Sequence, residues 1–455
     1  MSHTIAKTKS KTTFLCTVCR HRESKWLGRC PECGSWNSFE ESVEQPAAAQ
    51  KRPRAESVPV PLSSIPTAEA LRLDSGMGEM NRVLGGGIMK GSVSLLAGEP
   101  GIGKSTLMLQ LAAGINSAGR VLYISGEESP AQIRLRADRL GVRSDRIEIF
   151  SETELSALLG VCEKLKPIVV ILDSIQTVYS GDIGSVPGTV NQIKLCAQEL
   201  IDWAKTHGAA LFLVGHVTKE GYIAGPKVVE HMVDTVLYFD SGNAEIRLLH
   251  CGKNRFGSVD EIGIFEMGEQ GLTQVENPAA VFLSRRTGDQ PSGVAVAPIY
   301  EGSRILLVEI QSLVVAAKGG VSRVFSERID SARVSRMAAV LEKHLKVRLS
   351  DQDIYVNVGG GIRIGEVGVD LPLCLSLYSA RINQPLPALT ASVGEISLAG
   401  EVHPVGHLER RLRAVREMGF KRLVSPVGKD KQLQLPDFCL PVSTIAEAVR
   451  NGFQS

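Results

Sequence analysis

Short apolar runs alternate with amphipathic stretches from about residue 70 onward. The runs are apolar on both faces, as strands are when helices cover both sides of a parallel sheet. Helical patterns such as residues 105–115 and 191–208 lie between them. The sequence therefore predicts an α/β domain. Its expected strands are residues 92–98, 121–125, 147–150, 168–173, 210–215 and 234–239, with 245–250 and 262–266 extending one edge.

Composition shifts divide the chain further. The stretch 14–39 is rich in Cys, Gly and aromatic residues and has no long helical period, and 40–61 is polar and Pro/Ala-rich, like a flexible linker. A second shift near residue 280 precedes strand-like and helix-like blocks that continue to residue 455. We predict a metal-binding module at 1–40, a linker at 41–69, an α/β domain at 70–278 and a further domain at 279–455.

Charge and hydropathy narrow the class of protein. The formal net charge of +2 is too small to argue for nucleic-acid binding by itself. Residues 1–36 are locally basic, because they hold seven Lys and Arg residues against Glu23 and Glu32. No stretch approaches the roughly 20 apolar residues that span a bilayer, and the first residues lack the apolar run of a secretory signal. We expect a cytoplasmic protein that does not contact membranes.

Four of the nine cysteines are closely spaced. Cys16 and Cys19, and Cys30 and Cys33, form two C-x₂-C pairs. Each pair closes a tight knuckle, and two knuckles complete a tetrahedral zinc site, although the ten-residue spacer is shorter than usual. A redox pair is the alternative, and structural disulfides are rare in the cytosol. The other five are expected to be buried small hydrophobes (Cys162, Cys196, Cys251, Cys374 and Cys439).

Three aromatic residues lie around these knuckles, Trp26, Trp36 and Phe39. We expect them to pack around the knuckles. Stacking on a nucleic acid is the alternative role for them.

A nucleotide-binding motif follows the first expected strand. Residues 98–105 read G-x₄-G-K-S, a loop whose backbone N–H groups face phosphate oxygens at the start of a helix. Lys104 would reach the β- and γ-phosphates of ATP, and Ser105 would hold Mg²⁺. The predicted cofactor-binding residues are Gly98, Glu99, Pro100, Gly101, Ile102, Gly103, Lys104, Ser105, Thr106 and Asp173.

Polar residues end the neighbouring strands. Asp173 ends the run 168–173, at the sheet edge where ligands gather, and is the second predicted magnesium ligand. Glu127 and Glu128 follow another strand, and one of them should orient and deprotonate the attacking water. We favour Glu127; both could instead be solvated loop acids. His216 follows a third strand, as a γ-phosphate sensor or as a structural histidine.

Two cations, Lys253 and Arg255, end a later strand. Because they are two residues apart on an extended segment, they point to the same side. They either pair with local carboxylates or reach the γ-phosphate of a neighbouring subunit, as arginine fingers do.

Together these motifs resemble a known family. The pattern C-x₂-C-x₁₀-C-x₂-C, the segment GEPGIGKST and the segment KNRFG are similar to the bacterial RadA (Sms) family of DNA-repair proteins, over nearly the whole chain. The resemblance implies a RecA-like domain that forms hexameric rings, binds single-stranded DNA and couples ATP hydrolysis to branch migration. It also implies that Lys253 and Arg255 act in trans, and that the zinc module takes part in partner contacts and motor function. Recombinase or replication proteins are the expected protein partners, and whether the zinc module touches DNA or protein stays open.

The segment after residue 279 resembles the proteolytic domain of the Lon protease, especially residues 394–426. The position of the catalytic lysine falls on Glu409, and that of the serine at or near Asp370. An acid can supply neither the nucleophile nor its base. The resemblance therefore implies an α+β domain that is not a protease, but a ring scaffold. Seven arginines suit a phosphate-facing surface or a solvated helix face (Arg323, Arg328, Arg333, Arg336, Arg410, Arg411 and Arg413).

DNA contact within a RecA-like ring would come from the long, Gly-rich loops 176–190 and 218–230. Tyr179 and Tyr222 could stack on bases, and Lys219 and Lys227 could contact phosphates; the alternative is that these are connectors with incidental aromatics. A second hypothesis for the function is a nucleotide-dependent switch, because residues 75–106 also resemble KaiC-type ATPases. A third, an ATP-dependent protease, rests on the Lon-like segment alone.

Overall fold

A computed structural model describes most of the chain. The described residues are 12–19, 21–23, 25, 28–36, 38–43, 61–64, 71–115, 119–183, 186–216, 224–242, 245–275, 277–284, 290–317, 322–426 and 436–454. They fall into two compact units, Met1–Pro66 and Thr67–Ser455. None of the helices in the described part is long and apolar enough to cross a membrane.

The N-terminal unit is a small antiparallel sheet in the order β2-β1-β3. Its strands are β1 (Thr12–Cys16), β2 (Arg22–Glu23) and β3 (Phe39–Val43), and the 3₁₀ helix η1 is Leu62–Ser64. Cys16 ends β1, and its knuckle turns the chain toward β2; the second knuckle lies between β2 and β3.

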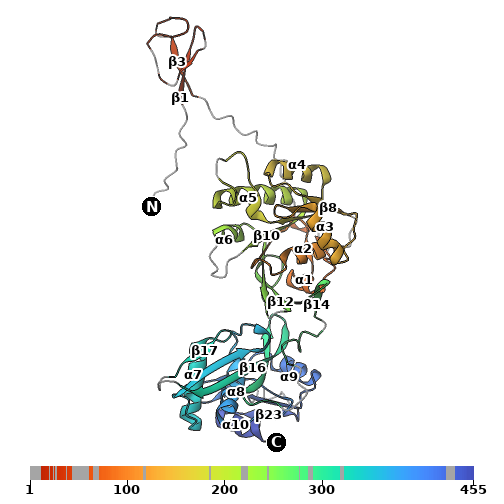
Figure 1. The fold of residues 1–455 in the computed structure, drawn as a ribbon, viewed down its shortest axis with the longest axis vertical. Coiled ribbons are helices and arrows are strands. Elements are labelled where there is room, and N and C mark those ends of the chain that lie inside the picture. The colour runs from red at the N-terminus through yellow and green to blue at the C-terminus, as the bar shows by residue number, and fades with distance from the viewer. Residues whose placement is uncertain are drawn as a thin grey trace. The chain divides into compact units, whose positions relative to one another are not determined.

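A nine-stranded sheet forms the first half of the larger unit, in the order β14-β13-β12-β11-β6-β10-β9-β7-β8 (Figure 1). From β11 to β8 all strands are parallel, and β12, β13 and β14 add antiparallel strands at one edge. This confirms the predicted parallel sheet and its edge extension. The strands are β6 (Val93–Gly98), β7 (Val121–Ser125), β8 (Ile147–Phe150), β9 (Val169–Asp173), β10 (Ala210–His216), β11 (Thr235–Ser241), β12 (Ile246–Asn254), β13 (Ile262–Gly268) and β14 (Gly271–Gln274).

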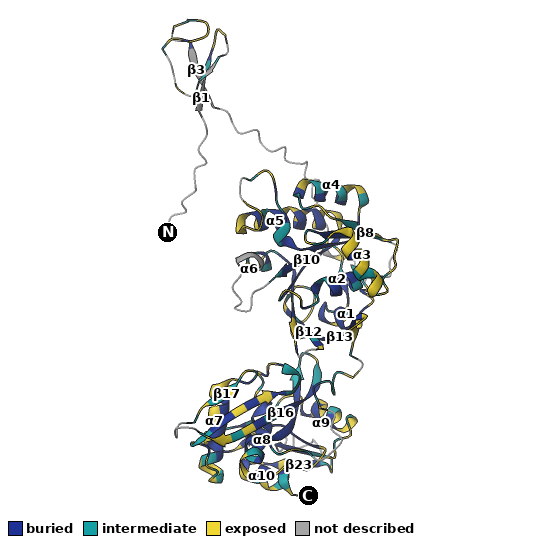
Figure 2. Ribbon diagram, in the orientation of Figure 1, coloured by how far each residue is buried: buried dark blue, intermediate teal, exposed yellow. Residues whose placement is uncertain are grey.

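Helices cover both faces of this sheet, so its strands are buried (Figure 2). Along β6, Leu96 packs with the core under α1, α2 and α3, whereas Leu95 packs with the core under α4 and α5. This explains why the parallel strands carry apolar residues on both faces. The elements are β4 (Arg72–Leu73), α1 (Gly78–Val83), β5 (Ile88–Met89), α2 (Lys104–Gly114), α3 (Pro130–Arg139), α4 (Leu155–Leu165), η3 (Ile175–Thr177), α5 (Val190–His207) and α6 (Ala224–Glu230).

The second half is an α+β domain built on a seven-stranded mixed sheet, in the order β17-β18-β16-β15-β19-β22-β23. Helices α7, α8 and α10 pack on one face, and α9 covers part of the other. The elements are β15 (Val294–Glu301), β16 (Arg304–Ala316), β17 (Val324–Ser326), α7 (Ser331–Leu345), β18 (Gln352–Val358), η4 (Gly359–Gly361), η5 (Val367–Val369), α8 (Asp370–Ile382), β19 (Thr390–Ser392), β20 (Glu395–Ile396), β21 (Val402–His403), α9 (Leu408–Glu417), β22 (Arg422–Pro426), β23 (Cys439–Val442) and α10 (Ile445–Phe453).

Buried contacts join the two halves. Arg304, at the start of β16, donates to both carboxylate oxygens of Glu79 in α1, at 2.8 and 2.5 Å. The same carboxylate accepts the amide of Ile264 in β13. Glu79 is buried and Arg304 is half-buried, and a bidentate pair of this kind holds the two side chains in a defined orientation. The predicted boundary after residue 278 therefore separates two sheets but does not interrupt the packing, and residues 67–455 form one unit.

Candidate nucleotide site and zinc site

The predicted phosphate-binding loop lies between β6 and α2, at the carboxyl end of the parallel strands. Gly101 and Gly103 have φ values of 77° and 111°, a region that residues with a Cβ rarely adopt. A Cβ at Gly98 would also lie 2.5 Å from the carbonyl oxygen of Phe239. The loop thus needs its glycines, and its backbone amides lie beside the N-terminus of α2, where phosphate binds favourably.

Lys104 is the first residue of α2 and is buried. Its Nζ donates to the carbonyls of Gly98 and Glu99, at 2.8 and 2.9 Å. Burial lowers its pKa to about 8, although Asp173 and Glu127 oppose that shift. A buried ammonium on a glycine loop fits the phosphate chain of ATP.

Asp173 ends β9 in the same sheet and accepts a hydrogen bond from the hydroxyl of Tyr123, at 2.8 Å. Burial, and then the charge of Asp173, raise the pKa of Tyr123 well above its usual value, so it remains a donor. One carboxylate oxygen of Asp173 is thereby oriented by Tyr123. Hard oxygen donors of this kind, with the hydroxyl of Ser105, fit Mg²⁺ bound together with phosphate.

Glu127 and Glu128 have different surroundings. Glu127 accepts from Ser174 Oγ at 2.7 Å and contacts His216 Nε2 at 3.1 Å. Burial raises the pKa of Glu127, but these hydrogen bonds and the charges of His216 and Lys104 outweigh burial and hold it below its usual value. Glu128 instead forms an ion pair with Arg136 of α3. The geometry thus favours Glu127 as the base.

Glu127→Gln should lower ATP turnover by about 10²- to 10⁴-fold, because an amide cannot accept the proton of the attacking water. Nucleotide affinity should change little, since Lys104 is unaltered. Steady-state phosphate release and binding of a fluorescent ATP analogue measure the two effects. Glu128→Gln is the matched control, and an equal loss in both variants would contradict the assignment.

The two cations of the later strand lie at the other end of the sheet. Lys253 Nζ donates to the carbonyls of Glu230 and Val233, at 3.0 and 2.7 Å, and Arg255 pairs with Asp234 at 3.3 Å. Asp234 also accepts the amide of Val93, the first residue of β6. The phosphate-binding loop follows the last residue of β6, about 16 Å further along the strand. Lys253 and Arg255 are therefore remote from the nucleotide site of their own chain.

The four predicted zinc ligands do come together. The sulfur atoms of Cys16, Cys19, Cys30 and Cys33 all lie within 4.8 Å of one another. Two of these separations are 3.7 and 3.5 Å, too long for a disulfide bond, which is about 2.05 Å. A tetrahedral site with Zn–S bonds of about 2.3 Å requires sulfurs about 3.8 Å apart, so the cluster fits zinc.

The aromatic residues around the knuckles can be placed only in part. Trp36 is exposed, and the guanidinium of Arg29 lies 5.6 Å from its ring. Trp36 therefore lies beside Arg29, the residue before Cys30, and most of its side chain is open to solvent. Trp26 and the side chain of Phe39 lie outside the described residues.

Comparison with known proteins identifies the chain. Residues 14–41 match the model of a rubredoxin metal binding domain, and residues 59–222 match that of an AAA domain. The DNA repair protein RadA of Treponema pallidum is 50% identical over 98% of both chains, and that of Bacillus subtilis is 44% identical over 98% of this chain and 99% of its own. This chain belongs to the RadA family. A solved structure, the KaiC-like protein PH0186 of Pyrococcus horikoshii, is 20% identical and covers 45% of this chain and 98% of its own, with a TM-score of 0.39.

Membership of the RadA family makes the chain a DNA-repair protein with an ATPase domain and a zinc ribbon. Other residues of the site were not predicted. Ser174 orients the carboxylate of Glu127, and Tyr123 orients that of Asp173. Arg136 forms an ion pair with Glu128. Ser174 directly follows Asp173, which is a usable signal, whereas Tyr123 is hidden inside an apolar run.

Cys19→Ser should remove the bound zinc from the full-length RadA-family chain, because three ligands leave the tetrahedral site incomplete. Metal analysis of the purified protein should fall from one zinc per chain to almost none. Cys162→Ser is the control, since Cys162 is buried between α4 and the sheet and is remote in sequence from the knuckles. Retention of zinc by Cys19→Ser would refute the ligand set.

The predicted DNA loops are only partly described. Tyr179 is bridged through its backbone to Glu154 and is half-buried, so it is anchored rather than free in the loop. Lys227 lies exposed on α6. Thr218, Lys219 and Tyr222 lie outside the described residues.

The two Lon-like positions and their surroundings are well defined. Asp370 begins α8, is buried, and accepts from Arg333 Nε at 2.6 Å. Glu409 lies exposed in the first turn of α9. Arg411 is also buried, where it forms a bidentate pair with Glu366 at 2.8 and 3.0 Å. The predicted phosphate-facing surface is therefore wrong for Arg333 and Arg411, because internal carboxylates neutralise both.

Proposed function

We propose that this protein is a DNA-dependent ATPase that binds single-stranded and branched DNA and drives branch migration as a hexameric, helicase-like ring. One observation supports a coupling between DNA binding and ATP hydrolysis. Ser174 and His216, which hold Glu127, are also the residues from which the loops after β9 and β10 begin. DNA that contacts either loop would therefore act on the position of the base.

Within one subunit, the residues of the site have different roles in ATP hydrolysis. Lys104 and the loop amides hold the phosphates. Ser105 and Asp173 would hold Mg²⁺, which would supply positive charge beside the phosphate oxygens. Glu127, oriented by Ser174 and His216, accepts the proton of the attacking water.

The place of Lys253 and Arg255 supports the proposed ring. They lie at the amino-terminal end of β6 and β11, whereas the phosphate loop follows the carboxyl end. A cation at one end of a subunit can complete a site at the other end only by reaching a neighbour. A head-to-tail ring brings the two ends together.

The decisive measurement is the ATPase rate of the full-length protein with and without single-stranded DNA, together with branch migration on a model junction. We expect DNA to stimulate turnover and ATP to drive migration. Unchanged turnover and no migration would favour a nucleotide-dependent switch of the KaiC type.

We also propose that the C-terminal domain is a ring scaffold without proteolytic activity. The carboxylate of Asp370 is engaged by Arg333 and by the amide of Ile396, which leaves no nucleophile there. Glu409 offers no amine to serve as a base. Degradation of casein with and without ATP tests this, and ATP-dependent cleavage would overturn it.

The proposal places this activity in the cytoplasm. Recombinase or replication proteins are its expected protein partners.

A further inference from the structure

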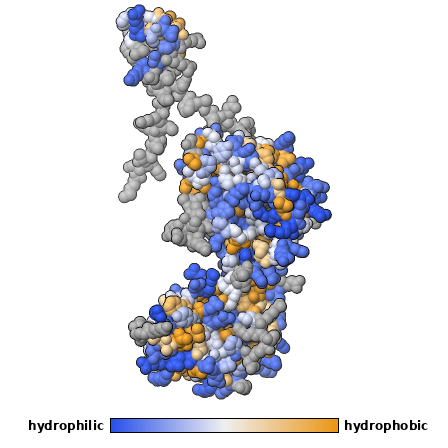
Figure 3. Space-filling model, in the orientation of Figure 1, coloured by the Kyte–Doolittle hydropathy of each residue, from blue (hydrophilic) through white to orange (hydrophobic). Residues whose placement is uncertain are grey.

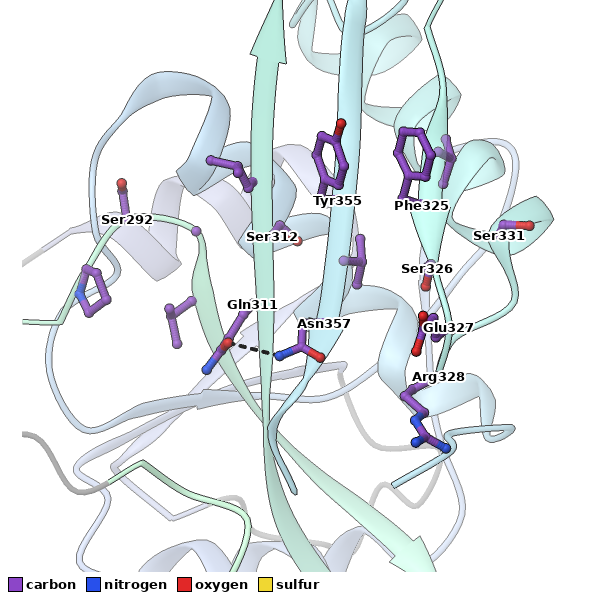
Figure 4. A pocket seen from close by; sticks show the side chains of 16 residues that line it. Ser292, Gln311, Ser312, Phe325, Ser326, Glu327, Arg328, Ser331, Tyr355 and Asn357 are labelled. Carbon is purple, nitrogen blue, oxygen red and sulfur yellow. Dashed lines mark hydrogen bonds between the residues drawn. The ribbon is translucent and has the colours of Figure 1, made fainter. Parts of the chain in front are cut away.

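One face of the C-terminal sheet is left partly uncovered. Residues of β16, β17 and β18 line a hollow of about 910 Å³ there (Figure 4). Leu313, Phe325 and Tyr355 are paired across the three strands in one row, and all three side chains are exposed. The rings of Phe325 and Tyr355 stack, with centroids 4.7 Å apart. The next row holds the amides of Gln311 and Asn357, which bond to each other at 3.4 Å.

This apolar row is a surface that a partner would cover. Leu313 is 57% exposed, Phe325 45% and Tyr355 38%, and Val315 extends the row along β16. Figure 3 shows hydrophobic surface on the C-terminal domain as well. Contiguous exposed apolar side chains of this kind mark interaction sites.

The charges of this face favour a protein over a nucleic acid. Arg323 is bound to Asp353 through two hydrogen bonds, at 3.3 and 2.6 Å, so its charge is compensated. Glu327 and Arg328 add one charge of each sign to the lining. Affinity for nucleic acid depends on cations that can neutralise phosphates.

The same chain carries a protruding apolar side chain elsewhere. Leu398 lies in the turn between β20 and β21 and is 73% exposed. The turn is held in place: His344 Nε2 of α7 contacts the carbonyl of Leu398 at 3.1 Å, and Ile445 of α10 donates to the carbonyl of Gly400 at 2.8 Å. A fixed turn that presents one leucine is suited to insertion into a hollow.

Leu398 and the hollow lie on opposite sides of the sheet. The turn touches α7 and α10, which pack on the face formed by Ile354 and Val356. Side chains alternate along β18, so Tyr355 and Asn357 point from the other face. Leu398 therefore cannot fill the hollow of its own chain.

We infer that the hollow is a subunit interface, occupied by the β20–β21 turn of a second copy of this chain, with Leu398 against Phe325 and Tyr355. A contact between two different surfaces of identical chains is head-to-tail, and it gives a ring when the rotation between neighbours closes. The inference rests on the proposed ring and names the surfaces that would close it.

The test is the mass of the full-length protein in solution. Leu398→Asp and Phe325→Asp should each reduce the wild-type ring toward the 49.0 kDa chain. A 1:1 mixture of the two variants should form a dimer of about twice 49.0 kDa, because the intact turn of one fits the intact hollow of the other. The dimer cannot grow, because its two free ends are the mutated surfaces. Leu135→Asp, at a residue equally exposed on α3, should leave the ring intact.

Double substitution Phe325→Cys with Leu398→Cys covers the case in which the charged variants fail to fold. Mild oxidation should then give a ladder of cross-linked chains, which neither single variant gives. Rings that persist in Phe325→Asp, or a loss of DNA binding at unchanged mass, would overturn this interface but leave the ring standing. A monomeric wild type would instead overturn the ring itself.

Discussion

Lys104→Ala should abolish ATP turnover and branch migration together. Lys104 is buried on the glycine loop, and its ammonium is the charge that the loop directs at the phosphates. The transition state spreads negative charge over the γ-phosphoryl oxygens, and an alanine leaves that charge without its nearest cation. Phosphate release and movement of a labelled junction should both fall to background.

The control for Lys104→Ala is Lys90→Ala, the same change at an exposed lysine just before β6. Its turnover should match that of the wild type. If Lys104→Ala still moved branches at the normal rate, the protein would not be an ATP-driven motor. A variant that had merely unfolded would be recognised by its thermal melting curve, which should keep the wild-type midpoint within a few degrees.

Local motifs were the part of the site that the sequence could predict. The glycine loop, the two cysteine knuckles and the acids at strand ends depend on neighbours in sequence, so spacing alone places them. The contacts that orient these groups come from distant strands. Tyr123 reaches Asp173 across β7 and β9, and His216 reaches Glu127 from β10. No periodicity encodes such pairs.

The strand pattern predicted the sheet for a similar reason. A strand that is buried on both faces has few polar positions, and such apolar runs can be recognised in the sequence. The surroundings of the arginines in the C-terminal domain were harder to predict. Arg333 and Arg411 have the spacing of exposed helical cations, yet both are buried against carboxylates. The carboxylates belong to Asp370 of α8 and to Glu366 in the turn before η5. The spacing of residues in a sequence does not predict which carboxylate a buried arginine pairs with.

Arg255→Ala should lower ATP turnover by about 10³- to 10⁵-fold, the effect of losing an arginine finger. Arg255 is 57% exposed just after β12, and within the described part of the chain its guanidinium pairs with Asp234. Asp234 would keep the amide of Val93 and the ammonium of Lys205, at 3.1 and 3.8 Å, so the fold should tolerate the change. Nucleotide binding should persist. If turnover is lost while the mass of the ring stays unchanged, Arg255 acts in catalysis and not in assembly.

Mixing distinguishes a trans-acting cation from a local one. Arg255→Ala chains retain Lys104 and Glu127, and Lys104→Ala chains retain Arg255. In a mixed ring, an Arg255→Ala subunit that receives the Arg255 of a Lys104→Ala neighbour has a complete site. The mixture should therefore hydrolyse ATP although neither variant does so alone. If Arg255 acted within its own chain, no mixed site would be complete, and the mixture would stay as inactive as its components.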